Sequence, residues 1–220
     1  LDLKAEIVGG KLEELVGSVA GARLAKGPFD LAVNLQGEGL SPPGLVAGLS
    51  GKGTLSLGPS ALQALSPEPL RRVAATAAKK TIKADKDEIA AEARAVRERI
   101  TRGVFRFEPV SLAFDVENGT LRLKPAVLIG SGAEAAVNGY VELAGLKLDS
   151  EWTVRLAGGH RDVPPVTLVF AGDLDRAGEI SPSVDTAAIE AYLTMRRMQE
   201  DVERLETLDL SGAAPAPEIE

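Results

Sequence analysis

Apolar and polar residues alternate from Val110 to Leu123, on both sides of the pair Asn118-Gly119. An Asn-Gly pair favours a two-residue type I′ turn, because both of its central positions need a positive φ. The stretch therefore predicts a β-hairpin whose apolar side chains share one face. The register set by this turn pairs Glu117 with Thr120, Val116 with Leu121 and Phe114 with Leu123.

The same alternation, with turns about every ten residues, predicts β-strands over residues 1–58 and an antiparallel meander over 104–182. The apolar period changes to 3.6 within 59–103, which predicts an inserted helical pair. An amphipathic helix is expected over 183–209, followed by a disordered tail at 210–220. We therefore expect one mainly β domain with α, its meander curved into a taco-like groove or half-barrel. The chain begins with Leu rather than Met, so we expect a fragment of a longer protein.

A sheet that is apolar on one face has to cover that face, either with protein or with a hydrocarbon ligand. Each buried CH₂ contributes about 0.8 kcal/mol, so a long acyl chain is held without any polar contact. A closed protein core fits the alternation equally well. The candidate groove residues, taken from the alternation alone, are Leu112, Phe114, Val116, Leu121, Leu123, Val127, Ile129, Val137, Val141, Leu143, Trp152, Val154, Leu156, Val166, Leu168 and Phe170.

The net charge of −7 argues against nucleic acid as a partner, because phosphates require a basic surface. Charge is unevenly spread, since the stretch from Pro67 to Arg106 carries a local +5 and the remainder −12. These cations favour a solvated helix face, with contact to anionic head groups or an acidic partner as the alternative. The candidates for that contact are Arg71, Arg72, Lys79, Lys80 and Lys83.

Residues for catalysis are scarce. The chain has no cysteine and one histidine, His160, which excludes a zinc site built from these two residue types. The sequence Gly51-Lys52-Gly53 lacks the Ser or Thr that a phosphate-binding loop places after its lysine. Asp149, Glu151 and Asp162 are scattered candidates for a glycosidase-like pair, although alternating strands point carboxylates outward by default. We therefore expect no enzyme, no catalytic or metal-binding residues and no cofactor.

Several motifs follow one another in a characteristic order. They are Gly-Lys-Gly-Thr-Leu-Ser-Leu-Gly at 51–58, Phe-Glu-Pro-Val-Ser-Leu-Ala-Phe-Asp-Val-Glu-Asn-Gly-Thr-Leu-Arg-Leu at 107–123, Val-Asn-Gly-Tyr-Val-Glu-Leu at 137–143, Leu-Lys-Leu-Asp-Ser-Glu-Trp-Thr-Val at 146–154, Pro-Pro-Val-Thr-Leu-Val-Phe-Ala-Gly-Asp-Leu at 164–174 and a Met-Arg-Arg-Met helix at 195–198. Their order resembles the C-terminal region of the AsmA family of bacterial envelope proteins. The resemblance spans roughly residues 40 to 208.

This resemblance implies a periplasmic, non-enzymatic domain of a protein anchored in the inner membrane by a segment outside this chain. Such proteins resemble bridge-like lipid carriers, whose apolar groove conducts phospholipid towards the outer membrane and supports outer-membrane lipid homeostasis and assembly. The implied partners are phospholipid acyl chains, the inner membrane and an outer-membrane or envelope protein. The family has no catalytic residues to transfer.

Two alternatives stay open. A scaffold for outer-membrane protein assembly would have its apolar face filled entirely by protein. A carbohydrate-binding β-sandwich would need exposed aromatic rings, for which Trp152, Tyr140 and Tyr192 are the candidates.

Overall fold

The computed structural model describes residues 2–14, 25–78, 86–130, 132–159 and 162–211. Within these residues, twelve strands join into one sheet, nine of them in a path that follows the chain. In spatial order this path runs β1 (Asp2–Lys11), β3 (Pro28–Gln36), β4 (Ser50–Leu57), β7 (Val110–Glu117), β8 (Thr120–Gly130), β9 (Ala133–Glu142), β10 (Lys147–Leu156), β11 (Val166–Asp173) and β12 (Ser183–Asp185). All pairings along the path are antiparallel, so the predicted mainly β fold with helices is confirmed.

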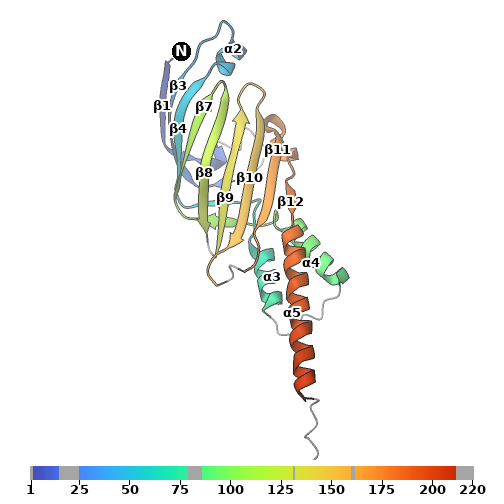
Figure 1. The fold of residues 1–220 in the computed structure, drawn as a ribbon. Coiled ribbons are helices and arrows are strands. Elements are labelled where there is room, and N and C mark those ends of the chain that lie inside the picture. Colours follow the sequence, from blue (N-terminus) through green and yellow to red (C-terminus); the bar gives the residue numbers. More distant parts are fainter. Residues whose placement is uncertain (1, 15–24, 79–85, 131, 160–161, 212–220) are drawn as a thin grey trace, which may run out of the picture.

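Three short strands branch from this path. They are β2 (Ala25–Lys26), β5 (Ser60–Leu62) and β6 (Phe105–Phe107), with β2 paired to β5, β5 to β6, and β6 to β8 through Phe107 and Gly130. The helices are α2 (Pro42–Ala47), α3 (Glu68–Ala77), α4 (Lys86–Arg99) and α5 (Ala187–Ser211), with a 3₁₀ segment η1 (Leu174–Glu179). Figure 1 shows α2 at one end of the sheet and α3, α4 and α5 at the other, which we call the α2 end and the helical end.

The predicted hairpin is confirmed as β7 and β8. Phe114 pairs with Leu123 and Glu117 with Thr120, in the register that the Asn-Gly turn requires. Asn118 and Gly119 have φ values of 48° and 71°, as a type I′ turn needs.

The sheet is open, with β1 and β12 as its edges, and it is not curled into the expected half-barrel. Strong curling of a sheet needs bulges and kinks repeated across the strands. The described pairings of the main path show register shifts only between Ile7 and Gly10 of β1 and between Leu123 and Ala126 of β8. Uninterrupted registers elsewhere leave the sheet open.

The inserted segment and the C-terminal segment differ in detail from their expected bounds. The stretch 59–103 begins with the strand β5 before its two helices, and β12 occupies 183–185 before α5 starts at Ala187. The backbone N–H of Ala187 donates to Asp185 Oδ1 at 2.9 Å, which helps to cap the helix. The expected disordered tail lies outside the described residues, except that α5 itself extends to Ser211.

The core lies at the helical end, between the helices and one face of the sheet. Leu70 and Val73 of α3, Val96 of α4 and Ile189 of α5 are almost fully buried there. They form one cluster with the inward-facing sheet residues Leu128, Ala133, Ala135, Val154, Leu156, Val166 and Leu168. This helix-covered half gives the domain its stability through apolar burial.

Candidate apolar binding groove

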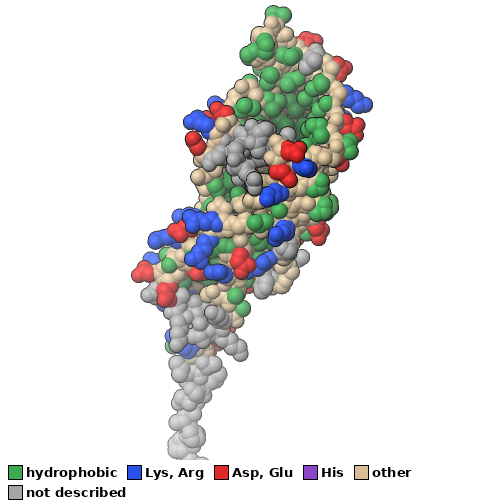
Figure 2. All heavy atoms as spheres, turned by 180° about the vertical axis from the view of Figure 1, so that it is seen from behind, with side chains coloured by type: hydrophobic (Ala, Val, Ile, Leu, Met, Phe, Trp, Pro, Cys, Tyr) green, Lys and Arg blue, Asp and Glu red, His purple; other side chains and the backbone are tan. Residues whose placement is uncertain are grey.

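One face of the sheet is covered by α3, α4 and α5 at the helical end. Towards the α2 end these helices no longer cover it. We call this surface the apolar face. Seen from behind, Figure 2 shows hydrophobic side chains gathered in a hollow over the upper part of the sheet, with charged side chains around its rim. The hollow is a groove of about 520 Å³.

Six strands from β3 to β10 contribute to the groove. Its lining is Leu31, Val33, Leu35, Leu55, Leu112, Phe114, Val116, Leu121, Leu123, Val137, Gly139, Tyr140, Val141, Leu143, Leu148, Ser150 and Trp152. Among these seventeen residues Ser150 supplies the only hydroxyl to the groove, because the Tyr140 side chain lies on the opposite face, beside Asp149 and Arg122. Such a surface has few hydrogen-bonding groups to offer and suits a hydrocarbon ligand.

Glycines opposite large side chains help to hollow the groove. Gly53 pairs with Phe114, and a Cβ added at Gly53 would collide with the phenyl ring. Gly139 pairs with Leu123 and Ser150, and a Cβ there would lie 2.7 Å from the Ser150 Cα. At both positions a neighbouring chain approaches closely because the side chain is missing.

Nine of the sixteen sequence-predicted groove residues line this groove. They are Leu112, Phe114, Val116, Leu121, Leu123, Val137, Val141, Leu143 and Trp152. Four others, Val154, Leu156, Val166 and Leu168, lie on the same face but in the helix-covered core. They are removed from the groove set because the helices fill the space above them, which alternation along a strand does not reveal.

Val127 and Ile129 were assigned to the wrong face. Leu123 pairs with Gly139 but Ala126 with Val137, so β8 carries one extra residue and bulges there. The bulge reverses the alternation, and the Val127 and Ile129 side chains are 44% and 50% exposed on the opposite face. Pro125 lies in the bulge, where a missing backbone N–H is tolerated. A proline inside an alternating run was the sequence signal of this reversal.

Besides Gly139, Tyr140 and Ser150, the sequence prediction missed five leucine and valine residues of the groove. They are Leu31, Val33, Leu35, Leu55 and Leu148. The first four belong to β3 and β4, which alternate as expected but join the meander only because β4 pairs with β7 across the helical insertion. Leu148 belongs to the meander itself, and its even-numbered alternation with Trp152 could have identified it.

A smaller apolar cavity of about 160 Å³ adjoins the groove at Trp152, and Phe170 contributes to this cavity rather than to the groove. We call it the Trp152 cavity. Its lining is Leu62, Ala64, Leu65, Leu148, Ser150, Trp152 and Phe170. The indole N–H of Trp152 donates to Ser150 Oγ at 3.3 Å, and its ring meets Phe170 edge-on with centroids 6.3 Å apart. The two rings thus present hydrocarbon to the cavity.

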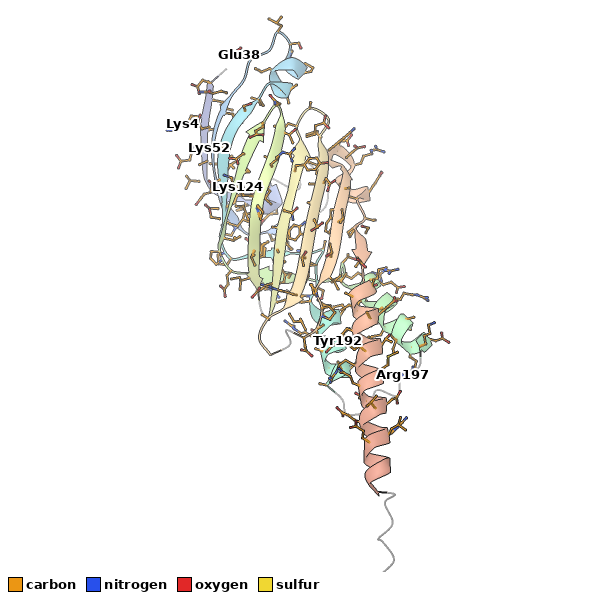
Figure 3. The ribbon with its side chains drawn as sticks, in the orientation of Figure 1. Lys4, Glu38, Lys52, Lys124, Tyr192 and Arg197 are labelled. Carbon is orange, nitrogen blue, oxygen red and sulfur yellow. The ribbon has the colours of Figure 1, made fainter. Side chains whose placement is uncertain are left out.

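The opposite face of the sheet is polar. Lys4, Asn34, Lys52 and Asp115 are successive cross-strand neighbours on β1, β3, β4 and β7. Lys124 of β8 forms an ion pair with Asp115 at 3.1 Å. Figure 3 shows the three lysines on the outer side of these strands. Polar residues on this face leave the apolar face as the surface suited to a hydrophobic ligand.

The carboxylates proposed for a glycosidase-like pair do not line the groove. Asp149 and Glu151 alternate with the groove residues of β10 and so lie on the opposite face, where Asp149 accepts from the Tyr140 hydroxyl at 3.4 Å. Asp162 accepts from the Tyr192 hydroxyl of α5 at 2.7 Å. Burial and this carboxylate raise the pKa of Tyr192 to about 12. These contacts give all but Glu151 a structural partner.

The remaining sequence candidates lie away from the groove or outside the described residues. Arg71 and Arg72 are exposed on α3, and Arg71 contacts Glu68 at 3.2 Å. His160, Lys79, Lys80 and Lys83 lie outside the described residues. In the described part of the chain, no group of three or more His, Cys, Asp or Glu side chains could hold a metal ion.

No helix among the described residues is both long enough and apolar enough to cross a bilayer. No family model matches the chain, and no curated protein or solved structure matches it either. The resemblance to the AsmA family therefore depends on the order of the sequence motifs.

Proposed function

We propose that this domain binds the acyl chains of phospholipid in the groove and serves lipid transfer in a bacterial envelope, without catalysing a reaction. The observation that carries the proposal is the groove itself, an apolar hollow of about 520 Å³ that the described helices leave uncovered. Contiguous exposed apolar surfaces of this kind mark ligand grooves or interaction sites in soluble domains.

The size of the groove suits a single long chain. A dry apolar cavity of about 150 Å³ accommodates benzene, which has six carbons. At that density the groove of about 520 Å³ holds on the order of twenty carbons, the length of a common acyl chain. Burying ten CH₂ groups contributes about 8 kcal/mol before ordering costs, which are themselves several kcal/mol. The net affinity is therefore moderate, as a carrier that releases its cargo requires.

The partition of the apolar face favours lipid binding over a purely structural role. A scaffold would fill this face with protein from end to end. Here α3, α4 and α5 pack over the helical end, and the described residues leave Leu121, Leu123 and Val141 half-buried at the α2 end. Packing of the described residues thus covers the helical half of the face and leaves the other half open.

The biological setting of this proposal comes from the sequence motifs. Their resemblance to the AsmA family supports a periplasmic domain of an inner-membrane-anchored protein that carries phospholipid towards the outer membrane. An outer-membrane or envelope protein would then receive the cargo.

Native mass spectrometry of protein purified from bacterial cells, followed by lipid extraction, tests the binding step. We expect bound phospholipid on the wild type and its loss in Leu121→Asp, whose carboxylate enters the groove. Val127→Asp is the matched control, because it places the same charge on the opposite face of the same strand. Repeated absence of lipid from the wild type, or equal lipid content in both variants, would overturn the proposal.

A further inference from the structure

The Trp152 cavity lies beside the groove, on the β11 side of β10. Leu148, Ser150 and Trp152 line both spaces, so a ligand in the groove contacts the wall of the cavity as well. The far wall comes from Leu62, the last residue of β5, and from Ala64 and Leu65, which follow that strand. The groove and the cavity are therefore two parts of one apolar track.

The track ends beyond Trp152. The next inward residue of β10, Val154, is fully buried, and so is Leu168, the cross-strand neighbour of Trp152 on β11. Close packing of these residues against the core leaves no space for a ligand along the strand. An extended ligand that follows β10 towards the helical end must stop at Trp152, where the cavity beside β10 can take its end.

The chemistry of the cavity selects a hydrocarbon end. Ser150 carries the only polar side chain in its described lining, and its hydroxyl oxygen already accepts from the Trp152 indole. A charged head group placed there would lose its hydration without gaining matching partners. The volume of about 160 Å³ is close to that of an apolar cavity that holds six carbons.

From this geometry we infer that the Trp152 cavity binds the terminal methyl end of the acyl chain, with about six carbons beyond the indole ring. The inference rests on the proposed function and adds a direction: the chain end points to the helical end, and the head group lies towards the α2 end. It also adds selectivity, because a chain too short to reach Trp152 leaves the cavity empty.

Trp152 is the only tryptophan of the chain, so its fluorescence reports on this site directly. The probes are phosphatidylcholines with one stearoyl chain brominated at carbons 6 and 7 or at carbons 11 and 12, added to delipidated protein. Bromine quenches indole fluorescence at short range. With six carbons beyond the ring, we expect at least twofold stronger quenching by the 11,12-dibromo lipid at equal occupancy. Equal quenching, or stronger quenching by the 6,7-dibromo lipid, would overturn the inference.

A cavity-filling variant gives an independent readout. Ala64→Phe should reduce the preference for 18-carbon over 12-carbon chains at least threefold, while Ala136→Phe on the exposed opposite face should not change it. An unchanged preference for 18-carbon chains in folded Ala64→Phe would contradict the inference. If this variant does not fold, the quenching pattern of the wild type still tests the inference. If both dibromo lipids bind but quench equally, only the inference is refuted. If no lipid binds, the proposed function is refuted as well.

Discussion

The division of one sheet face into a core half and a binding half can be measured by truncating one leucine in each. Leu168 is fully buried at the helical end, and Leu121 is half-buried in the groove. We compare Leu168→Ala with Leu121→Ala in delipidated protein, because bound ligand would stabilise the native state and mask the difference.

The two losses in the free energy of unfolding should differ severalfold. Truncation of a buried leucine to alanine typically costs 2–5 kcal/mol, since a cavity remains in addition to the lost transfer energy, so about 3 kcal/mol is expected for Leu168→Ala. Leu121→Ala removes three carbons that are only partly out of water and leaves open space rather than a sealed cavity. At about 0.8 kcal/mol per fully buried carbon, its cost should be close to 1 kcal/mol.

Urea unfolding followed by circular dichroism and by Trp152 fluorescence gives both values. Equal slopes of free energy against urea would show that neither variant alters the surface exposed on unfolding. In thermal unfolding, 3 kcal/mol corresponds to a drop in Tm on the order of 10 °C for a domain of this size. If Leu121→Ala costs as much as Leu168→Ala, the groove is ordinary core, and the physical basis of lipid binding disappears.

Three other substitutions test separate contacts. Tyr192→Phe removes the 2.7 Å hydrogen bond to Asp162 and should cost about 1 kcal/mol at neutral pH by urea unfolding. Because the raised pKa of Tyr192 favours its protonated form in the folded state, the wild type should lose stability between pH 10 and about 12, and a pH series in which Tyr192→Phe shows the same loss would refute this assignment. Gly139→Ala should cost about 1–3 kcal/mol because the new Cβ meets the Asp149 carbonyl oxygen at 2.5 Å, whereas Asn138→Ala on the exposed face should be nearly neutral. Met198→Glu, on the exposed side of α5, should change the free energy of unfolding by less than about 0.5 kcal/mol, and a larger loss would mean that this side is packed.

The sequence pattern predicted the features of the fold that depend on residues close together in the chain. The β7–β8 register follows from the Asn118-Gly119 turn alone, and the odd-numbered groove residues of β9 follow from simple alternation. The face on which the Val127 and Ile129 side chains lie depends on one extra residue beside Pro125, since a one-residue shift moves every later side chain to the other face.

Contacts between distant segments were beyond the reach of alternation. Leu55 meets Leu112 because β4 pairs with β7, although a helical insertion separates the two strands in the sequence. Val154 and Val166 are core rather than groove because α3, α4 and α5 fold back over their end of the sheet. A strand pattern specifies which side chains share a face, but not what covers that face.

One uninterrupted apolar face is thus divided between a packed core and the proposed binding groove. At the helical end each inward side chain stabilises the fold, since the helices remove it from water. At the α2 end, side chains such as Leu121 and Val141 are only half-buried. Each such leucine therefore contributes roughly 1 kcal/mol less to stability than a fully buried one. Polar substitutes at these positions would cost the fold little, because water already reaches them. Stability therefore does not require leucine or valine at the half-buried positions of the groove, whereas the proposed capture of an acyl chain does.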